Sequence, residues 1–185
     1  MKIAFFSLAT IAVLSVAASA QAPLGPNSIK LGKIAPAVDK TPDYMINGGP
    51  QKRSTPQNWL EVEVPFDTTP EEIESLDFNY TVLIDKTLIV GTVTHITIPA
   101  GRDHYSVMYI APRTLLKATG GKPLTAASIG NIWVQVAKQG QTLGETAMKP
   151  SPKPNLPTLP GLLQKSETPF APLFWDRYEA TAPKK

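Results

Sequence analysis

The chain has 185 residues, 18 of them Lys or Arg and 15 Asp or Glu, and carries a net charge of +3. This length suits one domain with appendages, and a positive charge so small and scattered excludes an electrostatic nucleic-acid binder. The chain contains no Cys, which excludes disulfides and an acylated lipoprotein anchor.

Residues 1–20 have the layout of a signal peptide. Lys2 precedes an apolar run, and Ala18-Ser19-Ala20 forms the small-x-small pattern of a cleavage site before Gln21. A retained anchor helix is the alternative, but the run is short for a membrane span and no later stretch approaches that length. We therefore predict an exported protein in the periplasm or on the outer cell surface, with no integral membrane segment in the mature chain.

The segment after the signal peptide is predicted to be an N-terminal arm over residues 21–42. It is rich in Pro, Gly and Lys, and its apolar residues are spaced too irregularly to form a face. Thr41–Ile46 is a short candidate strand that ends at the turn signal Asn47-Gly48-Gly49-Pro50. The folded domain is predicted to occupy residues 43–149.

The clearest strand pattern lies at Trp59–Phe66, where apolar and acidic side chains alternate. One face carries Leu60, Val62, Val64 and Phe66. The other face carries Glu61 and Glu63 and is predicted to contact water. Burying each apolar side chain is worth ~1.5–3 kcal/mol, so a second sheet must lie opposite. A single helical turn is predicted to begin at Thr69-Pro70.

Further strands are predicted along the rest of the domain, at Leu76–Asp85, Thr87–Ile98, Asp103–Ala111, Ile129–Lys138 and Leu143–Met148. One or two helical turns are predicted at Pro112–Thr119. In Thr87–Ile98, one face is predicted to carry Leu88, Val90, Ile96 and Ile98, and Gly91 indicates a bulge or bend.

About seven strands, with turn signals roughly every 8–12 residues, predict an all-β fold. The favoured architecture is an immunoglobulin-like antiparallel β-sandwich with extended, Pro-rich N- and C-terminal arms. A jelly roll or a barrel stays open as an alternative.

Residues 150–185 form a Pro-rich and aromatic tail. Large apolar side chains gather within nine of its residues, namely Phe170, Leu173, Phe174, Trp175 and Tyr178. A cluster of this kind is not left in water. It either folds back over its own sandwich or docks on an edge strand or groove of another envelope protein, in which case these five residues bind the partner.

No residue pattern indicates catalysis. Ser106 lies beside His104, but on the same face of one strand, and the chain has no Gly-x-Ser-x-Gly turn. Only two His residues exist, in different strands, and there is no calcium loop. We therefore expect no enzyme activity, no catalytic or metal-binding residue and no cofactor.

Two tryptophans suggest an alternative function. Trp59 and Trp133 lie off the apolar stripes of their strands and are candidates for stacking against a carbohydrate. The competing interpretation is that they cover a sheet edge or lie beneath the tail.

Five short stretches carry a resemblance to a known family, namely Thr41-Pro42-Asp43-Tyr44, Trp59–Val64, Tyr105–Pro112, Thr168-Pro169-Phe170 and Trp175-Asp176-Arg177-Tyr178. They resemble a family of exported proteins of Verrucomicrobia such as Akkermansia, associated with type IV-pilus-like gene clusters and reported to have an immunoglobulin-like fold similar to archaeal pilins. The resemblance implies a structural, pilus-associated protein and carries no catalytic residue. The expected function is thus a non-enzymatic cell-envelope module that contacts other envelope or pilus proteins, and the alternative is an adhesin-like module that binds carbohydrate or host protein.

Overall fold

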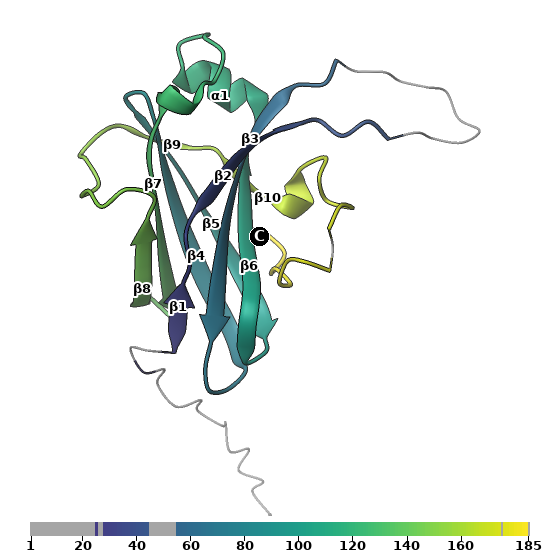
Figure 1. Ribbon diagram of the computed structural model, residues 1–185, viewed down its shortest axis with the longest axis vertical. Coiled ribbons are helices and arrows are strands. Elements are labelled where there is room, and N and C mark those ends of the chain that lie inside the picture. Colours follow the sequence, from purple (N-terminus) through teal and green to yellow (C-terminus); the bar gives the residue numbers. More distant parts are fainter. Residues whose placement is uncertain (1–24, 26–27, 45–54, 175, 185) are drawn as a thin grey trace, which may run out of the picture.

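The structure is a computed structural model that describes residues 25, 28–44, 55–174 and 176–184. Two five-stranded sheets face each other across one core, as Figure 1 shows. Sheet A contains β1 (Ile29–Leu31), β2 (Ala35–Lys40), β3 (Asn58–Thr68), β6 (Gly101–Ile110) and β10 (Leu162–Gln164). Sheet B contains β8 (Gln141–Ala147), β7 (Ile129–Lys138), β4 (Ile73–Ile84), β5 (Thr87–Ile98) and β9 (Thr158–Pro160), in that order. The predicted all-β sandwich is confirmed.

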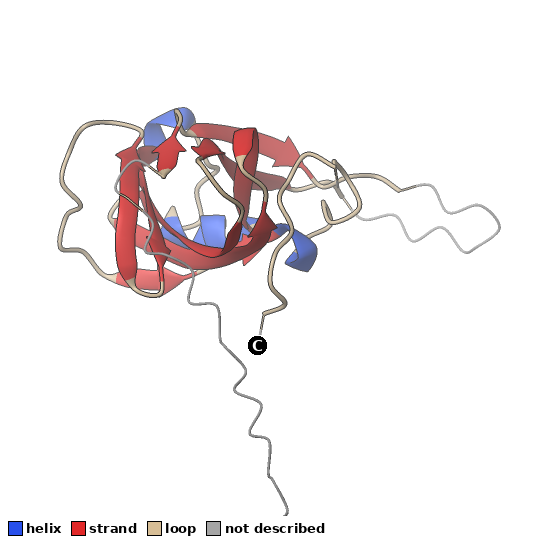
Figure 2. Ribbon diagram, turned by 90° about the horizontal axis from the view of Figure 1, so that it is seen from below, coloured by secondary structure: helices blue, strands red, loops and turns tan. Residues whose placement is uncertain are grey.

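The core explains why β3 has its alternating sequence. The four apolar residues predicted on one face of β3 are each at most 1% exposed, and they pack against the inner face of sheet B, which includes Phe78, Tyr80, Ile132 and Val134. Seen from the end, the strands surround this interior (Figure 2). Helix α1 (Pro112–Ala118) follows β6 as predicted, begins with a proline at its first turn and buries Leu115.

The two arms contribute four strands to the sheets, which raises the number in the described residues from the predicted seven or so to ten. No strand was predicted before Thr41, yet β1 and β2 lie there and pair with β3. The candidate strand at Thr41–Ile46 is wrong, because Thr41–Tyr44 form no strand, and Met45 and Ile46 lie outside the described residues. These short pairings satisfy backbone groups along one edge of β3 without an alternating apolar pattern, so the pattern could not reveal them.

The C-terminal chain closes the opposite side of the sandwich. β9 pairs in parallel with β5 in sheet B, and β10 pairs with β6 in sheet A, so the chain crosses between the sheets at Gly161. Farther on, the Ile96 amide donates to the Ala180 carbonyl (2.9 Å), and the Ala182 amide donates to the Thr94 carbonyl (2.8 Å). Within residues 150–174 and 176–184, the chain is therefore part of the sandwich as well as a covering.

Three local predictions are corrected. Thr69-Pro70 is a cis peptide in a bend before β4, and the predicted helical turn is absent from this described segment. In β5 the core-facing residues include Ile89 and Val93, and the predicted Val90 and Ile96 do not belong to the core. Gly91 makes no bulge, because its pairing with Tyr80 keeps the regular register. A Cβ at this position would lie 2.5 Å from Leu162 Cβ, so glycine lets β10 approach.

None of the helices in the described ranges is long and apolar enough to cross a membrane.

Candidate functional site

The outer face of sheet A is the surface on which the C-terminal tail lies. β3 and β6 alternate, so the side chains opposite to the core include Trp59, Glu61 and Glu63 on β3 and Val107 and Tyr109 on β6. Both Tyr109 and Val107 are buried, at 1% and 3% exposure. A chain segment outside the sheet must therefore cover them.

That covering is an aromatic cluster around Phe170. The Phe170 ring stacks on the Tyr109 ring, with centroids 4.8 Å apart and an interplanar angle of 7°. Trp59 meets the same ring edge-on, with centroids 5.7 Å apart. Leu173 and Tyr178 pack against this cluster. Of the two interpretations of the tail, folding back on its own sandwich accounts for these contacts.

An ion pair fixes the tail at a second point. The Arg177 guanidinium donates to both Glu63 carboxylate oxygens, with Nη2–Oε1 2.8 Å and Nε–Oε2 3.0 Å, and the Tyr178 hydroxyl donates to Oε2 at 2.9 Å. The guanidinium also lies 3.8 Å from the centroid of the Tyr105 ring. Burial by itself raises the pKa of Glu63, but the hydrogen bonds from Arg177 and Tyr178 outweigh it and hold the pKa below its ordinary value.

Glu61, two residues earlier on the same face, behaves in the opposite way. Its carboxylate accepts a hydrogen bond from the Tyr109 hydroxyl at 2.7 Å. Burial raises the pKa of Glu61, the Tyr109 hydrogen bond opposes that rise, and the negative charges of Asp39 and Glu63 add to it. The prediction that the Glu61 and Glu63 face contacts water needs correction, because both residues are partly buried and the tail leaves the Glu63 side chain 14% exposed.

A groove remains open beside the tail, which we call the tail groove. Its volume is about 680 Å³, and it lies between β2, β3 and the tail, lined by residues that include Asp39, Lys40, Glu61, Leu173 and Phe174. Phe174 is 64% exposed and has a φ of 51°. A bulky residue with positive φ and an exposed ring is uncommon, so Phe174 is the feature of the tail that its own fold does not explain.

A second polar centre is enclosed between the sheets. The ring nitrogen Nε2 of His95 lies 2.8 Å from the Ser106 hydroxyl, and the oxygen of that hydroxyl accepts a hydrogen bond from the Tyr80 hydroxyl at 2.7 Å. His95 Nδ1 lies 3.3 Å from the Glu179 carbonyl oxygen. A carbonyl can only accept, so Nδ1 carries the proton and Nε2 accepts from Ser106. Burial lowers the pKa of His95 to about 4, although the Glu179 carbonyl opposes this shift.

The geometry around Ser106 differs from the arrangement considered from the sequence. Its histidine partner is His95 on β5 and not His104, its neighbour on β6. His104 instead pairs with the Glu179 carboxylate at 2.7 Å and lies 3.4 Å from the Thr68 hydroxyl. Ser106 and His95 are 0% and 1% exposed, so a substrate has no access to the pair in this conformation. Within the described residues, no group of three or more His, Cys, Asp or Glu side chains is placed to hold a metal ion.

The remaining residues singled out from the sequence are dispersed. Trp59 belongs to the cluster under the tail and donates its indole N–H to the Thr41 hydroxyl at 3.1 Å. Trp133 lies on sheet B, in a separate groove beside the first residues of the tail, and its indole N–H donates to the Ser151 carbonyl at 2.8 Å. Trp175 lies outside the described residues.

Sequence reasoning missed Tyr109, Glu61, Glu63 and Arg177 as one connected face. The available signal was the pair of acidic residues on β3 together with an arginine inside the aromatic tail. Charges of opposite sign in two segments do not by themselves establish contact across more than a hundred residues.

Comparison with known proteins supports the fold. A family model matches residues 20–185. A crystal structure of a protein from Akkermansia muciniphila superposes with a TM-score of 0.73 at 19% sequence identity, covering 85% of this chain and 94% of that one. Curated proteins give no match. The chain therefore belongs to the Akkermansia-type family whose motifs its sequence carries.

Proposed function

We propose that this protein is a non-enzymatic, exported module of the bacterial cell envelope that binds another envelope protein beside a pilus-like assembly. The observation that carries the proposal is the exposed Phe174 at the rim of the tail groove. The neighbouring Phe170 is buried against sheet A. The tail thus holds one aromatic ring out to solvent from a fixed base.

The chemistry of the tail groove suits a protein partner. An exposed aromatic ring beside a groove is a typical anchor at protein interfaces, where buried aromatic residues carry much of the binding energy. Asp39, Lys40 and Glu61 supply charges at its edge, as in the polar rim of such interfaces. The base is rigid because Arg177 and Phe170 fix the tail on either side of Phe174.

Several features support a role without catalysis. The Ser106–His95 pair is sealed between the sheets, and the Tyr80 hydroxyl and the Glu179 carbonyl complete its hydrogen bonds. The signal-peptide pattern of residues 1–20 supports export. Membership in the Akkermansia-type family supports the link to a pilus-like assembly, through the association of that family with pilus-like gene clusters.

A pull-down from envelope extracts tests the proposal with the full mature chain as bait. Phe174→Ala removes the exposed ring, and we expect partner recovery to fall at least tenfold while the melting temperature stays unchanged. The matched control is Leu116→Ala on α1, which removes a side chain of similar exposure, 50%, from another part of the surface. Equal recovery of the same partners by the wild type and Phe174→Ala would contradict the proposal.

A further inference from the structure

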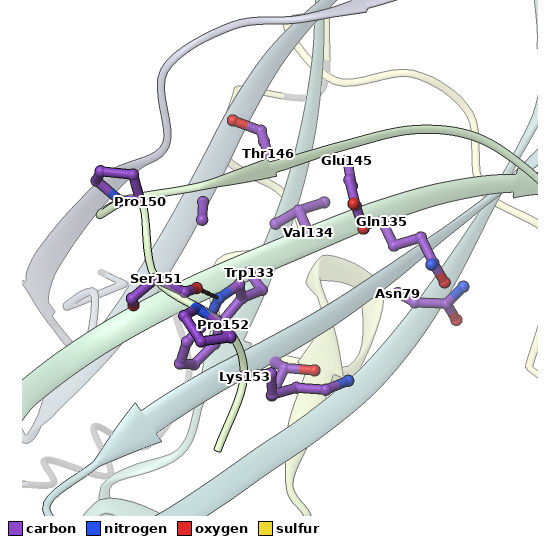
Figure 3. A pocket seen from close by; sticks show the side chains of 12 residues that line it. Asn79, Trp133, Val134, Gln135, Glu145, Thr146, Pro150, Ser151, Pro152 and Lys153 are labelled. Atoms are coloured by element: carbon purple, nitrogen blue, oxygen red, sulfur yellow. Dashed lines mark hydrogen bonds between the residues drawn. The ribbon is translucent and has the colours of Figure 1, made fainter. Parts of the chain in front are cut away.

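The outer face of sheet B carries a second groove, which we call the Trp133 groove. Its volume is about 400 Å³. Strands β4, β7 and β8 form its floor, and the extended segment of residues 150–153 forms its wall (Figure 3). This size falls within the range of small-molecule sites in proteins, roughly 300–1,000 Å³.

The strand register arranges the floor in two rows. In one row Asn79 on β4 lies opposite Gln135 on β7, which lies opposite Glu145 on β8. In the next row Thr81 lies opposite Trp133. Neighbouring strands are about 4.8 Å apart and alternate residues about 7 Å apart, so an aromatic ring adjoins a row of planar polar groups.

Hydrogen bonds hold Trp133 and the wall in place. The Trp133 indole N–H donates to the Ser151 carbonyl at 2.8 Å, drawn as the dashed line in Figure 3. Asn131, 3% exposed, holds the same segment, because its amide donates to the Lys149 carbonyl (2.9 Å) and the Ser151 hydroxyl (2.8 Å) and accepts from the Lys149 amide (2.8 Å). With its N–H already used, the π-face is what the half-buried indole offers to a ligand.

The polar row keeps its hydrogen-bonding capacity for a ligand. The Thr92 hydroxyl donates to Asn79 Oδ1 at 2.7 Å, which fixes the orientation of the amide and leaves its NH₂ group to donate outward. Within the described ranges, the side chains of Gln135 and Glu145 have no hydrogen-bond partner. Side by side in Figure 3, Asn79, Gln135 and Glu145 present both donors and acceptors.

We propose that the Trp133 groove binds a neutral carbohydrate, with a sugar ring lying along the Trp133 indole and its hydroxyls bonded to Asn79, Gln135 and Glu145. A sugar has an apolar C–H face and a rim of hydroxyls that both donate and accept, and the groove supplies one aromatic plane and both kinds of polar group. Glu145 and Lys153 carry opposite charges at the groove, which gives no net attraction for an anionic or cationic ligand. This proposal is independent of the tail groove.

An extended peptide fits this site less well. Strand addition pairs with the backbone at a sheet edge, which in this groove only β8 offers, whereas Asn79 and Gln135 stand on β4 and β7, whose backbones are paired on both sides. The recognition groups are therefore side chains. Their planar amide and carboxylate groups match hydroxyls better than they match the apolar side chains of a peptide.

Titration of the mature protein with methyl β-galactoside, N-acetylglucosamine, lactose and cellobiose, followed by saturation-transfer NMR, tests the site. We expect at least one sugar to bind with a dissociation constant of about 1 mM or tighter. Trp133→Ala should weaken that binding at least about tenfold, since it removes the stacking surface. Gln135→Ala should weaken it about fivefold through a lost hydrogen bond. Gln135 is exposed, so its substitution does not threaten the fold.

The matched control is Gln141→Ala, which removes an exposed glutamine at the start of β8, outside the groove. It should bind sugar as the wild type does. The proposal is overturned if no sugar of the four gives a signal at about ten times the expected constant, or if Gln135→Ala binds as tightly as Gln141→Ala. It is also overturned if extended peptides bind in a Gln135-dependent way and sugars do not.

Discussion

The outer faces of the two sheets differ in what lies on them. On sheet A, the tail buries Tyr109 and Phe170 and encloses Glu63 in hydrogen bonds from Arg177 and Tyr178. On sheet B, the row of Asn79, Gln135 and Glu145 is only flanked by residues 150–153 and stays open to solvent. The same chain segment, residues 150–184, thus borders one face and covers the other.

The difference follows from the outward-facing side chains of the central strands. β6 directs the apolar side chains of Val107 and Tyr109 outward, and these need a cover. β4 and β7 direct the amides of Asn79 and Gln135 outward, and these can bond to water or a ligand. Sheet A therefore has a largely covered outer face, and sheet B has an open one. The comparison predicts large stability effects on sheet A and small ones on sheet B.

The largest effect is expected from Phe170→Ala. Phe170 is 6% exposed, between Trp59 and Tyr109. Its truncation removes the stacked ring and uncovers Tyr109, so the free energy of unfolding should fall by about 3 kcal/mol. Urea denaturation followed by circular dichroism measures the change.

Phe174→Ala is the matched control, because it removes the same side chain from a position that is 64% exposed. We expect a change within about 0.5 kcal/mol. If the two variants are equally stable, the tail does not cover sheet A as described, and the contrast between the two outer faces fails.

The sheets were predictable where one strand face is apolar. The alternation of apolar and polar residues located β3, β4 and β7. Apolar residues at every second position, such as those around Leu60, Phe78 and Val134, indicate a strand with one face toward a core. The pattern failed at β5, where His95 faces inward and Gly91 makes room for β10. A buried histidine and a glycine cannot be recognised as core residues without the partner that each contacts.

The arms and the candidate sites were less predictable, for a different reason. The arms contain four short strands, namely β1, β2, β9 and β10. Each is defined by backbone hydrogen bonds to another strand, and these bonds do not require a particular pattern of apolar and polar side chains. The aromatic residues of the tail were recognised as a cluster that must pack against its own domain or against a partner. Its pairing with Glu63 through Arg177 depends on the register of β3 and on the path of residues 165–177, and neither can be obtained from local sequence.

A smaller effect is expected from Glu63→Gln. The pKa of Glu63 is held below its ordinary value of 4.5, so the folded state gains stability from the ionised carboxylate above that pH. This gain is lost as the pH falls through the lowered pKa. Because Arg177 is 42% exposed, the loss in Glu63→Gln at pH 7 should be only about 1 kcal/mol.

Urea titrations of wild type and variant at several pH values measure this difference, which should shrink as the pH drops below 4.5. Glu74→Gln on β4 is the control, since Glu74 is exposed and pairs with no other side chain in the described ranges. A stability gap that is the same at pH 7 and at pH 3 would mean that the ion pair does not hold the tail.

Glu61→Gln should give the smallest change, and in the opposite direction. Burial and the charges of Asp39 and Glu63 raise the pKa of Glu61, so the folded state favours its protonated form and loses stability as the pH rises past 4.5. Glutamine resembles that neutral form, and its carbonyl oxygen can still accept from the Tyr109 hydroxyl. The variant should therefore be more stable than wild type at pH 7, by roughly 0.5 kcal/mol or less, and equal to it in acid. Two neighbouring glutamates on one face of β3 would then have opposite effects, because the tail supplies a cation and a hydroxyl to Glu63, whereas Glu61 bonds to Tyr109 of β6. A loss of stability in Glu61→Gln at pH 7 would show that the tail supplies Glu61 with a positive partner as well.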